Sequence, residues 1–336
     1  SRPSCSDCSL SVHPTALVPR CPDRCYRGGQ QAGNSFLRAA EAQARTMIAT
    51  CHGLGDKGRQ GSEALRKQLP GEISRVGREL AQAIEIVPVE RDAATGRAAG
   101  QVGARLATYL PNYCAVVQDE RLQQQARGAK LSLVDEPELQ MPFKAQDSAL
   151  RMDEDARAVT REAIKEMVDL NSVRKVEWAT ATPGVVNPIF TVPKKECGVP
   201  TGEQRPIVDC RPVNAHLEDE HFKMQGLKEV KDRVRRDVWF TRLDLTKAYW
   251  TVPLAKEHAH LVRFIFEGEL YEAEALQFGI SSAPRLFSTT LQGVVDYLRS
   301  LNLEIVQYMD DLLFIGRTAA EAELAIELAA QVLEAV

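Results

Sequence analysis

The sequence has 336 residues, enough for two domains and at least one sizeable hydrophobic core. Its 44% hydrophobic and 26% charged residues are typical of a globular protein, and no apolar run approaches the length of a bilayer-spanning helix, so we expect no membrane partner. The net charge of −4 gives no global reason to expect nucleic acid, which would need a local basic surface. Eight cysteines without a visible secretory signal favour an intracellular location, cytoplasmic or nuclear, over secretion.

Residues 1–33 form a leader rich in Cys, Pro, Ser and Gly, with two close cysteine pairs. The pairs are Cys5 with Cys8, and Cys21 with Cys25. Four thiolates can complete a tetrahedral Zn²⁺ site, which would order a segment that has almost no apolar core of its own. The second pair has three intervening residues where two are usual, so a disordered cysteine-bearing tail is the alternative.

Residues 34–147 read as short amphipathic helices joined by glycine-rich breaks. Apolar residues share one helical face within 36–48, within 73–84 and within 102–110. The region contains no recognisable catalytic constellation. We expect a helical linker or assembly region here.

A helix with an acidic first turn begins at Asp153, and a basic hairpin follows it. The extended run 185–193 ends in Lys194 and Lys195, and 204–211 forms the returning strand. Taken alone, this pattern is also that of a solvated, charged hairpin with no binding role.

From residue 238 onward the pattern predicts a strand, a hairpin, a helix, a second hairpin and a last helix. In order, these elements cover 238–245, 262–276, 282–298, 304–315 and 318–333. This order can fold as a split βαβ sheet in an α+β protein, with two helices on one face. The first strand, which ends on Asp244, can then lie beside the second hairpin.

The tight turn of the second hairpin is acidic, with the sequence Tyr308-Met309-Asp310-Asp311. Adjacent aspartates repel one another in a shared site unless a cation neutralises them, and carboxylate oxygens suit Mg²⁺ or Mn²⁺. Asp is also a common turn residue, so an ordinary acidic turn is the alternative. With Asp244 beside this turn, three carboxylates can hold two Mg²⁺ ions roughly 3.5–4 Å apart, the arrangement used in nucleotidyl transfer.

Four motifs, in one order, resemble the fingers and palm of a retrotransposon reverse transcriptase. They are the hairpin from Lys194 to Arg205 with its continuation to Asn214, Leu243-Asp244-Leu245 with Ala248-Tyr249, Gln277-Phe278-Gly279 with Ala283-Pro284 and Phe287, and Tyr308-Met309-Asp310-Asp311. Within the family, the amino-acid sequences at 221–224 and 281–285 are similar to those of DIRS-like elements. Gln277 stands where the family usually has proline, so the resemblance does not predict the geometry of that loop.

The resemblance covers residues 148–336 and implies a polymerase palm, a ferredoxin-like split βαβ sheet with helices on one face, together with a fingers subdomain. It places the fingers at about 148–237 and 255–281, and the palm at about 238–254 and 282–336. The helical N-terminal region would precede them. Because the sequence ends at Val336, we expect the family's thumb and RNase H, and any element-encoded recombinase, to be absent from this chain.

The resemblance also implies catalytic and metal-binding roles. Asp244, Asp310 and Asp311 would be the catalytic residues and would bind two Mg²⁺ ions, with Mn²⁺ as a substitute. The backbone carbonyl of Leu245 would be a further metal ligand.

The incoming nucleotide would be bound by a second group of residues. Lys194 and Arg205 would contact the triphosphate, where a cationic point charge and a guanidinium fork neutralise negative charge. Tyr249 would be a steric gate that excludes a ribose 2′-hydroxyl, although a core aromatic is the alternative. Phe278 and Gly279 would form the floor under the new base pair, although Gly279 is also a plausible turn glycine.

We therefore expect an RNA-directed DNA polymerase module that extends a primer 3′-hydroxyl with dNTPs along an RNA or DNA template. The alternative is a catalytically inactive, truncated remnant of an element, acting as a nucleic-acid-binding or assembly protein. An unrelated metal-dependent phosphohydrolase is a more distant reading, and the basic hairpin counts against it.

Overall fold

The computed structural model describes residues 38–39, 41–48, 62–93, 98, 102–196, 199–234 and 238–336. The predicted zinc ligands, Cys5, Cys8, Cys21 and Cys25, lie outside these residues. Zinc binding by the 1–33 leader therefore stays a prediction, without support from the structure.

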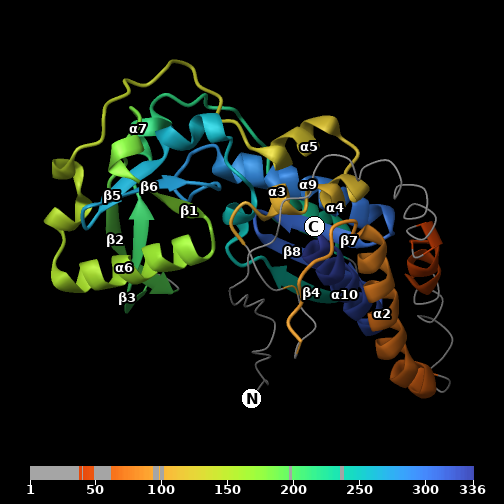
Figure 1. The fold of residues 1–336 in the computed structure, drawn as a ribbon. Helices are drawn as coiled ribbons and strands as arrows, with labels where there is room; N and C mark the ends of the chain where they lie inside the picture. Colours follow the sequence, from red (N-terminus) through yellow and green to blue (C-terminus); the bar gives the residue numbers. More distant parts are fainter. Residues whose placement is uncertain are drawn as a thin grey trace.

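Helices and strands are mixed along the described chain in an α+β arrangement of two lobes (Figure 1). Its strands form three small sheets with the orders β1-β6-β5, β2-β3 and β4-β8-β7. The strands are β1 (Val173–Val176), β2 (Ile189–Glu196), β3 (Val199–Val208), β4 (Trp239–Asp244), β5 (Arg263–Phe266), β6 (Glu269–Ala273), β7 (Glu304–Tyr308) and β8 (Asp311–Gly316). One lobe holds the first two sheets and the other holds β4, β7 and β8 (Figure 1).

Helices cover these sheets and connect the lobes (Figure 1). The α-helices are α2 (Ser62–Ile84), α3 (Arg105–Thr108), α4 (Leu110–Val116), α5 (Glu120–Arg127), α6 (Glu154–Asp169), α7 (Arg211–Asn214), α8 (Leu227–Arg233), α9 (Ala283–Ser300) and α10 (Ala319–Ala335). Short 3-10 helices are η2 (Lys144–Gln146), η3 (Ser148–Arg151), η4 (Trp178–Thr180), η5 (Ala248–Thr251) and η6 (Lys256–Leu261).

Two helix starts follow the predicted capping chemistry. The Asp153 carboxylate accepts a hydrogen bond from the Ala156 N–H at 2.8 Å at the start of α6. At the start of α10, the Thr318 hydroxyl oxygen accepts from the Glu321 N–H at 3.1 Å. These two helix starts lie where the sequence predicts them. A third predicted start, that of α9, has Ser282 at the N-cap and a proline in the first turn, but its side chain makes no capping hydrogen bond.

The sheet β4-β8-β7 is antiparallel throughout, and β4 lies beside the second hairpin, as the sequence predicts. Two side chains on one face of this sheet bond to the two long helices. Thr241 donates to the Ala322 carbonyl of α10 at 3.3 Å, and Gln307 donates to the Ser288 carbonyl of α9 at 3.0 Å. Helices α9 and α10 are therefore bonded to the same face of this sheet.

The first predicted hairpin, β5 and β6, does not join this sheet. It pairs with β1 instead. Arg263 and Glu272 form an ion pair across the hairpin with both side chains only 4% exposed, and Glu272 also pairs with Arg174 of β1. The pairing with β1, together with the contact between Glu272 and Arg174, therefore holds the hairpin in the other lobe. The described part of the sheet around Asp244 therefore has three strands, and the expected split βαβ sheet is formed only in part.

The N-terminal helices share the hydrophobic core of the C-terminal ones. Helix α2 lies along α10 (Figure 1), and its buried Val76 and Leu80 belong to the same core cluster as Leu328 and Val332 of α10. The division of the chain at residues 33 and 147 stays a prediction. No helix in the described part of the chain combines the length and apolarity needed to cross a bilayer.

His258 links η6 to the N-terminal region. Its Nδ1 accepts a hydrogen bond from the Leu131 N–H at 2.9 Å. Burial lowers the pKa of the imidazole; Glu257 raises it by a smaller amount, and His260 and Lys130 lower it slightly. The ring is therefore neutral near pH 7, and a proton on Nδ1 would remove the acceptor.

We predict that the chain loses stability as the pH falls below about 6.5, because His258 takes up a proton more readily in the unfolded chain. Substitution His258→Asn keeps a neutral acceptor and should flatten this pH dependence. Urea denaturation at pH 7 and pH 5 measures it. The control His221→Asn, at an exposed position, should behave as wild type, and an unchanged pH dependence in His258→Asn would contradict the assignment.

Candidate active site

The acidic turn connects β7 to β8 with two central residues, Met309 and Asp310. Tyr308 pairs with Asp311 across it, and Met309 adopts a positive φ of 51°. A non-glycine residue in this region costs of order 1 kcal/mol and persists only where the surroundings impose it, commonly at functional sites. A positive φ at the first central residue alone is the pattern of a type II′ hairpin turn.

Three carboxylates meet at this end of the sheet. The register of β4 on β8 places Asp244 directly opposite Asp311, and the Leu245 N–H donates to the Asp310 carbonyl at 3.1 Å. Burial raises the pKa of the Asp310 carboxyl, and the charges of Asp244 and Asp311 raise it further. The structure therefore places the three predicted metal-binding carboxylate residues at one end of the sheet.

Arg242 is a fourth charged residue of this site, and the sequence interpretation missed it. Its Nε lies 2.8 Å from Asp311 Oδ1, its Nη2 lies 2.6 Å from the same oxygen, and Nη2 is 3.9 Å from Asp244 Oδ1. The hydrogen bond to Asp311 raises the pKa of the guanidinium. The available signal was strand alternation, because residues 242 and 244 of one strand point to the same face.

The donor set suits a hard divalent cation. Three carboxylates and the Leu245 carbonyl are all oxygen ligands, the type that Mg²⁺ and Mn²⁺ prefer. Among the described residues, no three acidic, His or Cys side chains are arranged as a finished metal site. The Asp311 carboxylate is paired with Arg242. The residues therefore supply the kind of donor atom that the metal prefers.

Tyr249, in η5, stands next to the acidic turn. Its hydroxyl lies 3.9 Å from the Met309 sulfur, and its ring packs against Phe278 at 4.7 Å and edge-on against Phe287 at 5.4 Å between centroids. Burial raises the pKa of the phenol, and the charge of Asp310 adds to this effect. The half-buried ring thus joins the carboxylates to the loop that carries Phe278.

The loop with Phe278 and Gly279 is held by polar side chains. Asn214 donates to the Gly279 carbonyl at 2.8 Å and accepts from the Ser281 N–H at 2.9 Å. Gln277, where the family usually has proline, is buried, and its amide donates to the carbonyl of Ser172 at 3.0 Å. A side-chain amide therefore anchors this loop, so its geometry is fixed by a hydrogen bond where the family usually has proline.

Gly279 is required by its surroundings. It has a φ of 105°, and a Cβ at this position would lie 2.6 Å from the Val208 carbonyl oxygen. Val208 ends β3, so the loop is pressed against the base of the basic hairpin. Phe278 beside it remains 50% exposed and available for contact.

The predicted triphosphate contacts, Lys194 and Arg205, lie on the β2–β3 hairpin. Arg205 pairs with Val192 and is exposed, and Lys194 lies at an irregularity in the strand pairing between Pro193 and Lys195. This hairpin is in the opposite lobe from the acidic turn (Figure 1). Its connection to the site runs through Val208 and Gly279.

Comparisons with known proteins identify the class. Residues 192–336 match the family "Reverse transcriptase (RNA-dependent DNA polymerase)". The chain is 27% identical over 134 residues to the Transposon Tf2-3 polyprotein of Schizosaccharomyces pombe, covering 40% of this chain and 10% of that protein. It is 24% identical over 120 residues to Polyprotein P3 of Commelina yellow mottle virus, covering 36% of this chain and 6% of that protein.

The carboxylates, Tyr249 and the loop of Phe278 thus lie in a reverse transcriptase domain, which belongs to the nucleotidyltransferases. Residues 192–336 therefore form a reverse transcriptase domain, as the motif order predicts, and the chain resembles a transposon polyprotein. The chain spans about a tenth or less of the length of these relatives. Reverse transcriptases generally use Mg²⁺, which agrees with the donor set. The matches do not bear on the DIRS-like subtype, which stays a prediction.

We predict that Gly279→Ala lowers the free energy of unfolding by about 3 kcal/mol, because a strained backbone and a steric clash add together. The matched control is Gly268→Ala, at a φ of 76° with no atom within 4 Å of the added Cβ. It should cost only about 1 kcal/mol. Chemical denaturation measures both, and equal losses would show that the contact with Val208 is unimportant.

We also predict that Arg242→Gln strengthens Mn²⁺ binding by about fivefold at low salt, because an exposed ion pair that competes for Asp311 is worth up to about 1 kcal/mol. Electron paramagnetic resonance of free Mn²⁺ measures the affinity without any turnover. The control Arg161→Gln breaks the ion pair with Glu267, in the other lobe, and should leave the affinity unchanged. Weaker binding in Arg242→Gln would contradict the competition.

Proposed function

We propose that residues 148–336 are the fingers and palm of an RNA-directed DNA polymerase, with the boundaries given above. The module extends a primer 3′-hydroxyl with dNTPs along an RNA or DNA template. The observation that carries the proposal is the pairing of β4 with β8, which sets Asp244 opposite Asp311 while Tyr249 contacts Met309 in the same turn. Nucleotide addition needs carboxylates that hold metal ions and, beside them, a side chain that contacts the sugar of the nucleotide, the role we give to Tyr249.

Asp244, Asp310, Asp311 and the Leu245 carbonyl would hold two Mg²⁺ ions. When bound, the ions activate the attacking oxygen and stabilise the leaving oxygen of an in-line displacement. The raised pKa of Asp310 reflects the mutual repulsion and burial that bound cations would relieve. Arg242 supplies positive charge to Asp311 and would have to give up this contact for Asp311 to serve as a ligand.

The protein binds the rest of the nucleotide through the two lobes. The exposed Arg205 presents a guanidinium fork suited to phosphate oxygens, and Lys194 of the same hairpin adds a second cation. Phe278 offers an exposed ring under the new base pair. Tyr249, held between Phe278 and Phe287, leaves too little space for a ribose 2′-hydroxyl and selects deoxyribonucleotides.

The second candidate is a catalytically inactive element remnant that binds nucleic acid or serves in assembly. The observation that favours it is the ion pair between Arg242 and Asp311, which ties up one of the three carboxylates. The pair is exposed, with side-chain exposures of 65% and 38%, so breaking it costs little. Polymerase activity therefore remains the leading proposal.

We predict that Asp310→Asn lowers primer extension by about a thousandfold, because an amide neither neutralises nor binds a divalent cation as a carboxylate does. Extension of a labelled primer on an RNA template, with Mg²⁺ and dNTPs, measures the rate. The control Asp296→Asn, at an exposed position of α9, should match wild type.

The same assay separates the two candidates. Undiminished extension by Asp310→Asn would refute the catalytic assignment. Absence of dNTP incorporation by the wild-type chain, with template binding retained, would favour the inactive remnant.

A further inference from the structure

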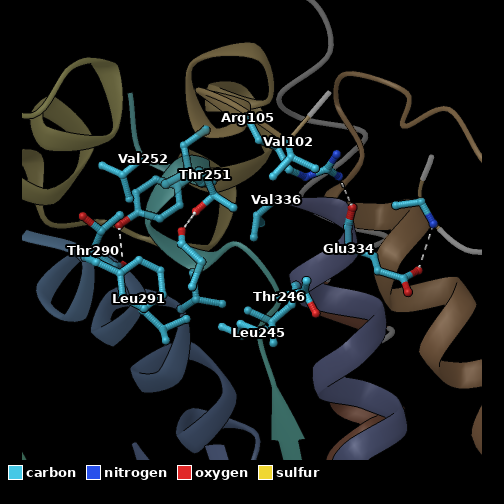
Figure 2. A pocket seen from close by; sticks show the side chains of 17 residues that line it. Val102, Arg105, Leu245, Thr246, Thr251, Val252, Thr290, Leu291, Glu334 and Val336 are labelled. Atoms are coloured by element: carbon cyan, nitrogen blue, oxygen red, sulfur yellow. Dashed lines mark hydrogen bonds between the residues drawn. The ribbon is translucent and has the colours of Figure 1, made fainter. Parts of the chain in front are cut away.

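Residues 102–131, here called the strap, lie outside the matched segment 192–336 and bond to the chain that follows Tyr249. They contain α3, α4 and α5. Figure 2 shows Val102 and Arg105 of the strap beside Thr251 and Val252, which follow Tyr249 in the chain. Residues 248–258, here called the gate segment, therefore have the strap as a direct neighbour.

The strap bonds to the backbone of the gate segment at two places. The Ala104 N–H donates to the Trp250 carbonyl at 2.8 Å, next to Tyr249. Further along, the Ala129 N–H donates to the Pro253 carbonyl at 2.8 Å, and the Ala129 carbonyl accepts from the Ala255 N–H at 2.9 Å. Backbone pairing of this kind fixes position to a few tenths of an ångström.

Gly103 shows how closely the strap approaches. Its N–H donates to the Leu170 carbonyl at 2.6 Å, and a Cβ on Gly103 would lie 2.2 Å from the Asn171 carbonyl. The turn 170–172 is the one that accepts the Gln277 amide, through the Ser172 carbonyl. The strap therefore touches the support of the Phe278 loop as well as the gate segment.

The strap also holds the first turns of α9, which carry Phe287. Gln125 donates to the Leu286 carbonyl at 2.6 Å and to the Thr290 hydroxyl at 2.5 Å. The hydroxyl of the fully buried Tyr113 donates to the Thr290 carbonyl at 2.9 Å. Because Phe287 packs edge-on against Tyr249, these bonds act on the gate ring through one side chain.

A cavity of about 150 Å³ lies among the strap, the gate segment and α9 (Figure 2). Its lining includes Ala248, Thr251 and Phe287, together with Leu106 and Tyr113 of the strap. Side chains that border a cavity lose dispersion contacts on that side. The position of the gate segment consequently depends on its polar contacts with the strap more than it would in a filled core.

We propose that the strap is a positioning element of the nucleotide site and that, by fixing Tyr249 between Phe278 and Phe287, it sets the choice between deoxyribonucleotides and ribonucleotides. This inference rests on the proposed polymerase function. It gives a role in substrate choice to residues upstream of the segment that matches the family. Gln125 and Tyr113 are positioning residues in this scheme, since neither touches the site itself.

The test compares Gln125→Leu with Gln124→Leu in the full chain. The first removes the amide donors to α9 at nearly constant volume, and the second changes an exposed neighbour. We expect Gln125→Leu to lower the ratio of kcat/KM for dNTP over rNTP by about fivefold, the equivalent of one lost hydrogen bond, mainly by raising KM for dNTP. Gln124→Leu should keep the wild-type ratio.

Two further measurements make the result decisive. Tyr113→Phe removes the hydroxyl that bonds to Thr290 and keeps the ring, so it should shift the ratio in the same direction. Hydrogen exchange of peptides covering 248–258, without nucleotide or metal, should be faster in Gln125→Leu than in wild type. Reduced stability in both variants with an unchanged dNTP to rNTP ratio would overturn the proposal, because the strap would then be structural only.

Failure of the proposed function gives a different pattern. If the wild-type chain incorporates no nucleotide, the polymerase assignment fails, and exchange in the nucleotide-free chain then decides the positioning role alone. Faster exchange over 248–258 in Gln125→Leu would support that role, and unchanged exchange would overturn it.

Discussion

The site depends on the antiparallel register of β4 on β8. Since side chains alternate along a strand, a slip of one residue would turn Asp244 to the opposite face and bring Leu243 beside Asp311. Two features oppose that slip: Leu243 and Leu312 pair on the face covered by the helices, where both are buried, and Thr241 bonds to α10 from the same face. The core on one face therefore determines where the carboxylates stand on the other.

This arrangement leaves an electrostatic problem. Bringing Asp244, Asp310 and Asp311 together is unfavourable without a positive charge: burial raises the pKa of Asp310, and the charges of Asp244 and Asp311 raise it further. Arg242 supplies that charge from the same strand. A long, exposed side chain is well suited to this task, because it stabilises the carboxylates in the metal-free chain and can leave at little cost when a divalent cation arrives.

The sequence was informative where the signal is local and uninformative where partners are far apart in the chain. Alternating strands, the tight turn and the helix caps predicted the neighbours of Asp244 and the two helices on one face. The sequence did not predict which sheet the β5–β6 hairpin joins, because this depends on pairing with the distant strand β1 and on the ion pair between Arg174 and Glu272. The amide anchor of Gln277 was equally hidden, since its acceptor, Ser172, is identified only by the fold.

The partners of the strap were also not predictable from local sequence patterns, because they lie far away in the chain. Its residues carry no catalytic signature, and periodicity alone indicated a linker. Yet the chain between Trp250 and Ala255 obtains its backbone partners from Ala104 and Ala129, so the ring of Tyr249 is held by a segment more than a hundred residues upstream. A steric gate discriminates by a distance of about one oxygen atom, and misplacement by about 1 Å costs up to a hundredfold in a positioned reaction. With Tyr249 as the steric gate, as we propose, support for its ring is part of the chemistry, and the proposed polymerase site extends beyond the segment that carries its motifs.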